Sequence, residues 1–417
     1  MFTKIAASLG ILLVLQSANV QRVLTDAKFQ AAEDFVAQDH DRLVREIIQI
    51  TEIEAPPFKE ARRARAFTEM LRQSGLTNVE IDSEGNVIGI RKGSGTGPTI
   101  AIAAHLDTVF PEGTNVKVRR EGTKLYAPGV GDDSRALAVL LQMVRAMDAA
   151  KIQTAGDILF IGNVGEEGPG DLRGMKYLFQ KGPYKDKIKM FISLDPFGWG
   201  NDITTAGIGS KRFRVTFNGP GGHSFGSFGL VSPAYALGNA ITKLSRMQVP
   251  QRPRTTYNVG VVGGGTSVNS IPFESWMDVD IRSETKEELN RAVETFTRLM
   301  HEAADEENHA RSTSQGKIEV EVRVIGDRPF GEISHNAPIV QTASAVIRAF
   351  GMSPVYGMSS TDANIPMSMG IPAMTLESGG TGSRNHTLDE WIDVEKTASV
   401  RGIHVVMGIL LSLAGML

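Results

Sequence analysis

Two adjacent glutamates, Glu166 and Glu167, are the side chains in this sequence best placed to do chemistry together. They follow the apolar run 158–161, which predicts a buried strand, so the pair lies where that strand ends. Side chains alternate in direction along an extended chain, so one carboxylate can bind a metal ion while the other accepts a proton. Taken alone, such a pair is typical of a solvated acidic turn. The catalytic interpretation therefore depends on the residues that accompany it.

Other candidate metal ligands also follow predicted strands or precede a helix. They are His105 with Asp107, Asp195, His386 and the pair Asp132-Asp133 before a long helix. In an open α/β sheet, ligands bind beyond the carboxyl ends of the strands, so these residues can converge. Each has a simpler interpretation by itself: a surface His-x-Asp, a helix N-cap, a turn before a proline, or a solvated histidine. Their recurrence in one chain favours a shared site.

The chemistry of these residues fits a hydrolase with two metal ions. The sequence contains no cysteine, so disulfides, thiolate ligands and a cysteine nucleophile are excluded. Histidine and carboxylate ligands without sulfur suit zinc in a catalytic site. Two divalent ions about 3.5–4 Å apart can hold and acidify a bridging water. Such a site needs one bridging carboxylate, one free carboxylate as a base, and a carboxylate such as Asp107 to fix the tautomer of a ligating histidine.

The elements that would hold this site predict a discontinuous α/β domain. The chain has 417 residues, which favours two or three domains. Buried strands are expected at 87–90, 99–103, 158–161 and 190–194, with a helix at 136–147. This alternation indicates a sheet covered by helices. Alternating strands in the order β-α-β-β-α-β then predict an inserted domain. We expect a first catalytic part at 26–208, the insertion at 209–326 and a second catalytic part at 327–417.

The N-terminus predicts an export signal. A short start containing Lys4 precedes the apolar run 5–15, and the small residues Ser17 and Ala18 follow it. The run is too short for a comfortable membrane span, although an uncleaved anchor and a buried helix are alternatives. We expect residues 1–20 to be a signal peptide. The mature enzyme would then be periplasmic or secreted, without a stable membrane span.

Five motifs cover nearly the whole chain after this segment. They are residues 104–108 (AHLDT), 129–133 (GVGDD), 165–168 (GEEG), 193–195 (SLD) and 379–386 (GGTGSRNH). Together they resemble the cocatalytic-zinc exopeptidase family that includes peptidase T, glutamate carboxypeptidase, aminoacylase and succinyl-diaminopimelate desuccinylase. The resemblance implies a zinc-exopeptidase-like mixed sheet flanked by helices and interrupted by a smaller α+β lid or dimerisation domain with a four-stranded sheet. It also implies a cis peptide bond between Asp132 and Asp133.

The resemblance implies two metal sites that share one carboxylate. The metal ligands would be Asp132 as the bridge, Glu167 and His386 in one site, and His105 and Asp195 in the other. Asp107 would orient His105, and Glu166 would be the general base. The expected cofactors are two divalent ions, Zn²⁺ by preference, with Co²⁺ or Mn²⁺ as alternatives.

The insertion carries three further residues that the resemblance brings into the site. His223, in residues 219–224 (GPGGHS), would stabilise the oxyanion, often from the partner subunit of a dimer; its simpler interpretation is an incidental histidine in a turn. Asn269 and Arg282 resemble positions that contact substrate. Arg282 suits a substrate carboxylate but equally an exposed strand end. In the main domain, Gly379 would present backbone groups to the substrate.

One segment departs from the family pattern. The family commonly has Lys-Gly-Gly or a similar run after the aspartate pair, whereas this chain has Ser134-Arg135-Ala136. The metal ligand is retained, but the start of the following helix is different. The substrate pocket can differ for the same reason.

Together these features predict a dizinc metallopeptidase that hydrolyses small peptides, as a di- or tripeptidase or a carboxypeptidase. A metal-bridging water would attack the carbonyl, with Glu166 as the base. An N-acyl-amino-acid amidohydrolase would need the same catalytic residues, and a catalytically inactive relative that binds peptide or metal is a further alternative. The expected partners are a small peptide or N-acyl amino acid and a second copy of the chain. A net charge of -3 gives no basic face for nucleic acid.

Overall fold

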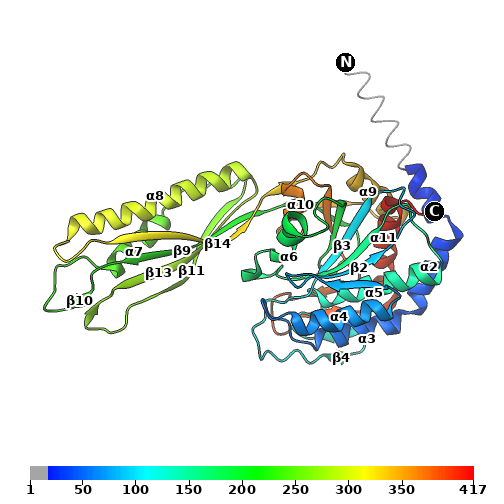
Figure 1. Ribbon diagram of the computed structural model, residues 1–417, viewed down its shortest axis with the longest axis horizontal. Coiled ribbons are helices and arrows are strands. Elements are labelled where there is room, and N and C mark those ends of the chain that lie inside the picture. Colours follow the sequence, from blue (N-terminus) through cyan, green and yellow to red (C-terminus); the bar gives the residue numbers. More distant parts are fainter. Residues whose placement is uncertain (1–16) are drawn as a thin grey trace, which may run out of the picture. The chain divides into compact units, whose positions relative to one another are not determined.

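The computed structural model describes residues 17–417, which divide into two compact units (Figure 1). The main unit contains the chain up to Gly207 and from Gly331 to Leu417, and the inserted unit contains Ile208–Phe330. The insertion is longer than the expected range 209–326 because β14 (Glu319–Arg328) stays paired with β9 (Gly209–Asn218) as far as Arg328.

The main unit is built on a nine-stranded mixed sheet with the order β1-β2-β6-β3-β7-β17-β8-β15, in which β16 also pairs with β8. The strands are β1 (Asn78–Ile81), β2 (Val87–Arg91), β3 (Thr99–His105), β6 (Ile158–Asn163), β7 (Ile188–Leu194), β8 (Asp202–Gly207), β15 (Gly331–Glu332), β16 (Val355–Ser359) and β17 (Ala373–Leu376). The central strands β6, β3, β7 and β17 run parallel. They are covered on both faces, which explains their continuous apolar sequences. Their carboxyl ends share one edge of the sheet.

Helices cover both faces of this sheet. The larger core joins one face to α2 (Ala27–Gln38), α3 (His40–Thr51), α4 (Ala61–Gln73), α5 (Ser134–Ala149), α9 (Pro338–Ala349) and α11 (Lys396–Ala414). The smaller core joins the other face to α6 (Arg173–Lys176), the π-helical turn Tyr177–Lys181 and α10 (Asn364–Ser368). Successive residues of β3 enter opposite cores: Ile100 and Ile102 pack in the larger one, and Ala101 and Ala103 in the smaller one. The expected α/β class is thus confirmed.

The N-terminal described residues are part of the main unit. Residues 17–24 are helical, and Val20 and Val23 are buried in the larger core. Asn19 donates a hydrogen bond from Nδ2 to the carbonyl of Ser412 (3.0 Å), and Arg22 donates one from Nη2 to the carbonyl of Met416 (2.7 Å). Of the expected signal peptide 1–20, residues 1–16 lie outside the described residues, and its last four residues lie in this packed helix.

Helix α11 is the only described helix long and apolar enough to cross a membrane. Its most apolar window has a mean hydropathy of 1.5, and 72% of that window is buried inside the main unit. Helices that are apolar on all sides are typical of protein cores as well as of membranes. The helix packs against α2 and α9, so it serves here as a core element.

A second, small sheet in the main unit has the order β18-β19-β5-β4. Its strands are only three residues long: β4 (Arg119–Glu121), β5 (Lys124–Tyr126), β18 (Thr381–Ser383) and β19 (Trp391–Asp393). It brings the segment before α5 next to the loop between β18 and β19. These are the segments that contain Asp132 and His386.

The inserted unit is a four-stranded antiparallel sheet with the order β11-β13-β9-β14. Its further strands are β11 (Thr255–Gly264) and β13 (Glu274–Ser283), and a two-stranded pair joins β10 (Gly222–His223) to β12 (Ser270–Ile271). Helices α7 (Pro233–Leu244) and α8 (Lys286–Ala310) pack on the sheet around Phe213, Phe217 and Phe296. Burial alternates along β13, so one face of the sheet forms this separate core. The predicted four-stranded insertion is confirmed.

Candidate metal centre

The carboxyl ends of the central strands bring the candidate ligands to one edge of the main sheet. His105 is the last residue of β3, Asp195 directly follows β7, and Glu167 lies in the loop after β6. Asp132 comes just before α5, and His386 lies between β18 and β19. Because β6, β3 and β7 are adjacent and parallel, their ends are neighbours in space.

The carboxylate of Asp132 lies between two histidines. Its Oδ1 is 2.9 Å from Nε2 of His105, and its Oδ2 is 3.1 Å from Nε2 of His386. His386 Nε2 is also 3.0 Å from Oε1 of Glu167. Two groups that share Asp132 have ligand atoms within 4.8 Å of one another: one with His105 and Asp195, the other with Glu167 and His386. The structure thus brings all five predicted ligands together.

The pKa values of three candidate ligands, Asp195, His386 and His105, are raised within this cluster. Burial, then repulsion by Asp132, raises the pKa of Asp195 to about 8. Hydrogen bonds with Asp132 and Glu167 raise the pKa of His386 to about 10. Burial lowers the pKa of His105, but its hydrogen bond with Asp132 and nearby carboxylates outweigh this effect and raise it well above the ordinary value. Concentrated negative charge of this kind, with imidazole and carboxylate donors, fits divalent ions such as zinc.

Asp107 holds both His105 and the acidic pair, through different groups. Nδ1 of His105 lies 2.9 Å from the main-chain carbonyl of Asp107. A carbonyl oxygen only accepts, so Nδ1 carries the proton and Nε2 faces Asp132. The Asp107 carboxylate instead accepts the main-chain N–H groups of Glu166 (3.1 Å) and Glu167 (2.8 Å). The hydrogen bond to the histidine thus comes from the main chain of Asp107, whose carboxylate lies 3.8 Å from the same nitrogen and binds the two glutamates.

Glu166 lies in the same cluster as the ligands. It is buried, and it groups with His105 and Glu167 within 4.8 Å. Its main-chain N–H is fixed by Asp107. The structure therefore places Glu166 beside one candidate ligand from each of the two groups, His105 and Glu167.

Two buried carboxylates near the ligands were not among the predicted functional residues. Asp133, joined to Asp132 by the cis peptide bond that the resemblance implied, accepts the main-chain N–H of His105 through Oδ2 (3.0 Å). Glu390 accepts the main-chain N–H of Asp132 (3.0 Å). Asp133 could have been predicted from the sequence, because it adjoins the candidate ligand Asp132. Glu390 lies in none of the five motifs, so the sequence provided no reason to select it.

The unusual Arg135 lies beneath the glycine loop that follows β17. Its guanidinium is fully buried and donates from Nη2 to the carbonyl of Ser378 (3.3 Å) and to both the carbonyl (3.3 Å) and the hydroxyl (3.0 Å) of Ser399. A β-carbon at Gly379 would lie 3.0 Å from that nitrogen. Burial lowers the pKa of Arg135 to about 10, so it remains charged at neutral pH. The departure from Lys-Gly-Gly therefore places an arginine under Gly379.

The three candidate residues of the inserted unit do not form one group. His223 is exposed in β10, and its Nδ1 accepts the main-chain N–H groups of Phe225 and Gly226, both at 3.2 Å. Asn269 is adjacent, because its carbonyl accepts the N–H of Ser224 (3.0 Å). Arg282 is near the opposite end of β13 and pairs with Asp280 at 2.6 Å. The structure therefore brings His223 and Asn269 together and places Arg282 elsewhere in the sheet.

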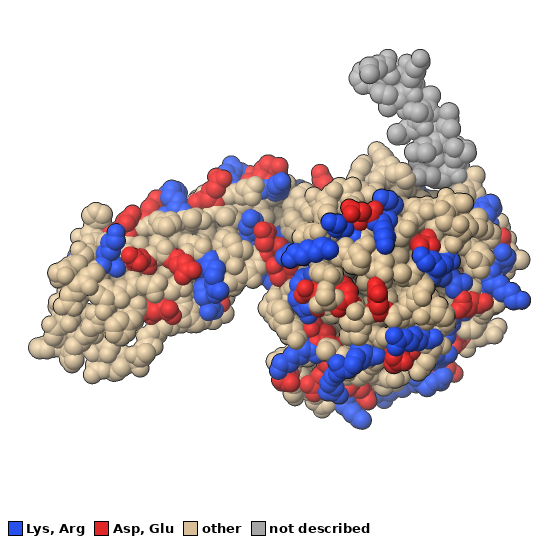
Figure 2. Space-filling view, in the orientation of Figure 1, with Lys and Arg blue, Asp and Glu red and all other residues tan. Residues whose placement is uncertain are grey.

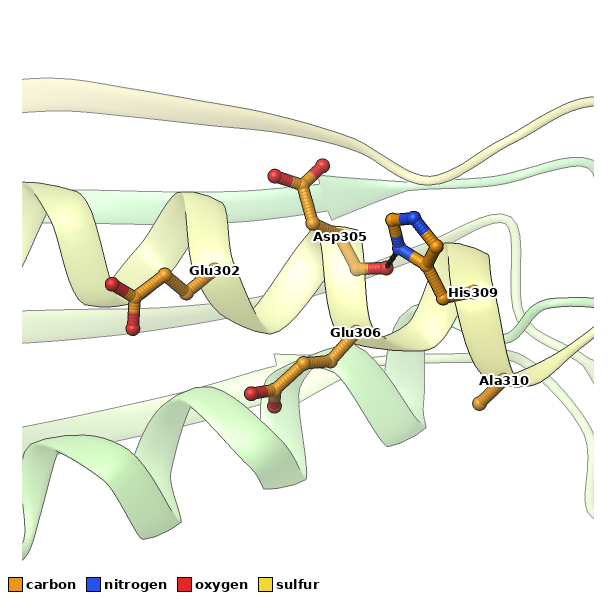
Figure 3. A pocket seen from close by; sticks show the side chains of 5 residues that line it. All are labelled: Glu302, Asp305, Glu306, His309 and Ala310. Atoms are coloured by element: carbon orange, nitrogen blue, oxygen red, sulfur yellow. Dashed lines mark hydrogen bonds between the residues drawn. The ribbon is translucent and has the colours of Figure 1, made fainter.

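The inserted unit also has an acidic hollow on α8, lined by Glu302, Asp305, Glu306, His309 and Ala310 (Figure 3). Nδ1 of His309 lies 2.6 Å from the main-chain carbonyl of Asp305. Lys243 pairs with Glu306 (2.6 Å) and with Glu302 (3.6 Å). These ion pairs account for Glu302 and Glu306 as part of a charged helix surface.

Comparison with known proteins identifies the family. Residues 101–412 match the model of peptidase family M20/M25/M40. Succinyl-diaminopimelate desuccinylase of Corynebacterium glutamicum is 25% identical over 85% of this chain and 93% of its own length. Carboxypeptidase G2 of Pseudomonas sp. is 25% identical over 78% of this chain and 77% of its own length.

Solved structures share the fold. Aminopeptidase PepT of Bacillus cereus has a TM-score of 0.71 and 25% identity, with 90% of this chain and 99% of that chain covered. A tripeptidase of Staphylococcus aureus also has a TM-score of 0.71, with 22% identity over 90% of this chain and 98% of its own.

These structures contradict the expectation that the protein is periplasmic or secreted. The two neighbours are an aminopeptidase PepT and a tripeptidase, which give the expectation of export no support. The expectation rested on the apolar run 5–15 and the small residues after it. Those small residues, Ser17 and Ala18, lie in the helix that leads to the buried Val20. The prediction of export is therefore withdrawn.

Proposed function

Because the chain belongs to peptidase family M20/M25/M40, we propose that it is a two-metal exopeptidase that hydrolyses small peptides. The observation that carries this proposal is the shared carboxylate of Asp132, which lies between His105 and His386 with Glu167 and Asp195 beside them. The family and the donor set support hydrolysis of peptide or amide bonds with divalent metal ions. The printed names of the similar proteins include an aminopeptidase, a tripeptidase and a carboxypeptidase, which favour a small peptide as substrate.

The ligands divide into two sites of three residues. Asp132 would bridge both ions, His105 and Asp195 would complete one site, and Glu167 and His386 the other. Zinc suits these donors, and when bound it supplies an acidified water and an electrophile for the scissile carbonyl. Glu166 would accept a proton from the attacking water and donate it to the leaving amine. Asp107 keeps Glu166 and Glu167 in place through their main-chain N–H groups.

The inserted unit would complete the site in a homodimer. Its end around β10 has exposed apolar side chains, namely Phe225, Phe228, Val268 and Phe273. On the face that Figure 2 shows, this end has few Lys, Arg, Asp or Glu side chains. Exposed apolar patches are typical of interaction surfaces. His223 would then stabilise the oxyanion in the partner subunit's active site, and the mass of the protein in solution tests the dimer.

Three residues are proposed to contact the substrate. Asn269 lies next to His223 and would act with it. Gly379 has a φ of +92° and lies against α11, and the loop around it would present main-chain groups to the substrate. Arg282 would bind a substrate carboxylate in exchange for Asp280, with which it is paired.

One relative favours a second candidate function, the removal of acyl groups from N-acyl amino acids. The desuccinylase is similar over 85% of this chain, and this reaction would use the same catalytic residues. A panel of di- and tripeptides, C-terminally extended peptides and N-acyl amino acids separates the two functions. We expect turnover of peptides. Turnover of N-acyl amino acids alone would establish the deacylase instead, and no turnover with metal bound would indicate an inactive relative.

The decisive test of the mechanism replaces Glu166 by glutamine. The amide cannot accept a proton, so we expect kcat to fall by about 10²–10⁴-fold while two metal ions per chain stay bound. Metal content of the purified protein and steady-state kinetics measure the two effects. Glu69→Gln, at an exposed residue of α4, is the matched control and should change neither. If Glu166→Gln kept the wild-type kcat, Glu166 would not be the general base. If the purified wild-type protein contained no metal, the two-metal proposal would be wrong.

A further inference from the structure

Glu390 binds the segment that leads to Asp132 with both its side chain and its main chain. Its carboxylate accepts the main-chain N–H groups of Gly129 (2.9 Å), Gly131 (2.7 Å) and Asp132 (3.0 Å). Its carbonyl accepts the N–H of Ala127 (3.1 Å). The side chain is fully buried. Four hydrogen bonds therefore connect one residue to the segment 127–132.

This segment is closely packed and lies between β5 and α5 without being part of either. Gly129 has a φ of +75°, and a β-carbon there would lie 2.7 Å from Thr108. A β-carbon at Gly131 would lie 2.5 Å from Phe197. Buried N–H groups without a partner are strongly unfavourable. The Glu390 carboxylate supplies the acceptor for three of them at once, which determines the path of the main chain into Asp132.

Glu390 is also tied to a second ligand. It follows His386 by four residues in the sequence. Its main-chain N–H donates a hydrogen bond to the carbonyl of Thr387 (3.2 Å). One short segment thus contains His386 and the residue that holds Asp132. Nε2 of His386 lies 3.1 Å from Oδ2 of Asp132. Moving Glu390 would therefore change the separation between these two ligands.

We propose that Glu390 is a positioning residue of the metal centre, which fixes the main chain of Asp132 relative to His386 and so sets where the shared carboxylate lies between the two metal sites. This inference rests on the two-metal function proposed above. The same arrangement occurs twice more in the site. Asp133 accepts the N–H of His105, and Asp107 accepts the N–H groups of Glu166 and Glu167. In each case a buried carboxylate outside the five proposed ligands holds the main chain of a ligand segment.

The test compares Glu390→Gln with Asp82→Asn. Glutamine keeps the size of the side chain but replaces one acceptor oxygen by an NH₂ group, which faces N–H donors. Asp82 is the matched control, because it also accepts three main-chain N–H groups, from Glu84, Gly85 and Asn86, in the turn between β1 and β2. Titration of Zn²⁺ into chelator-treated protein gives both metal affinities. Melting with and without Zn²⁺ gives the metal-dependent gain in Tm.

We expect Glu390→Gln to weaken the affinity for at least one Zn²⁺ by about 10–100-fold and to reduce the metal-dependent gain in Tm. The kcat should fall while KM stays within about twofold, since the substrate contacts are not altered. Asp82→Asn should retain both wild-type affinities, even if its metal-free Tm falls. A folded Glu390→Gln protein with both wild-type affinities would overturn the proposal.

Glu390→Asp serves if the glutamine variant does not fold. Aspartate keeps the negative charge, but its side chain is shorter by one CH₂ group, so its oxygens lie farther from the three N–H donors. We therefore expect weaker Zn²⁺ binding than in the wild type. Wild-type affinities in this variant would equally overturn the positioning role. A wild-type protein that itself binds fewer than two ions would instead contradict the two-metal function, so the two failures are distinguishable.

Discussion

At the scale of single residues, Asp107 shows how one side chain orders two functions. Its two carboxylate oxygens accept the N–H groups of Glu166 and Glu167, while its carbonyl binds His105. Asp107→Asn leaves one oxygen for two donors and should lower kcat by about 10–100-fold, with little change in KM. Steady-state kinetics with the preferred peptide measure this effect. A higher KM at unchanged kcat would place Asp107 at the substrate instead.

The grouping of the candidate ligands could be expected from the sequence, but the residues that hold them could not. His105, Glu167 and Asp195 each follow an apolar run, and the ends of adjacent parallel strands meet by the rules of α/β sheets. Glu390 gives no such signal. It meets Asp132 across 258 positions of the chain, through two loops whose path no periodic pattern determines.

At the scale of elements, the close contact between α11 and the glycine loop is required by geometry. A β-carbon at Gly402 would lie 2.3 Å from Cα of Gly379. Gly402→Ala should therefore force the helix and the loop apart and lower the free energy of unfolding by about 1–3 kcal/mol. Urea denaturation monitored by circular dichroism measures the change.

Gly238→Ala provides the control on another helix. Gly238 is exposed in α7, and a β-carbon there would meet no atom within 4 Å. Alanine favours the helix by up to about 1 kcal/mol, so this variant should be as stable as the wild type or more stable. Equal stability of Gly402→Ala and the wild type would show that α11 and the loop can separate without loss.

The contact between α2 and α11 predicts a dependence of stability on pH. Burial, then the charge of Asp34, raises the pKa of Glu33 to about 7, and burial lowers the pKa of His404 beside it. A carboxyl whose folded pKa exceeds its unfolded pKa favours the folded state less as pH rises from about 4.5 to 7. Glu33→Gln removes the titrating carboxyl and with it this loss of folding stability at higher pH. Its Tm relative to the wild type should therefore be higher at pH 8 than at pH 5, and an equal difference at both values would contradict the pKa.

Elements with a clear period were predictable, and very short elements were not. The apolar runs 99–103, 158–161 and 190–194 correspond to β3, β6 and β7, and the helix expected at 136–147 corresponds to α5. The small sheet around β5 and β19 has three-residue strands, which are too short to show alternation. This sheet nevertheless brings His386 close to Asp132. The element that positions these two ligands could therefore not be predicted from the sequence.

At the scale of the whole molecule, the chain contains two units with separate cores. The main unit packs its helices on the mixed sheet, and the inserted unit has its own core around Phe217 and Phe296. The change of sequence pattern near residue 209 indicated this division, because continuous apolar strands give way to alternating ones. All five candidate metal ligands belong to the main unit.

Metal removal should therefore destabilise one unit and leave the other unchanged. Ligands stabilise only the structure that binds them, by about 4 kcal/mol when the free ion is at a thousand times its Kd. We expect two transitions in differential scanning calorimetry, of which a chelator lowers only the one that belongs to the main unit. The separately expressed fragment 208–330 assigns the other transition by its own Tm. If a chelator lowered both transitions equally, the metal sites would have to stabilise the two units as one cooperative structure, and the independence of the two cores would be disproved.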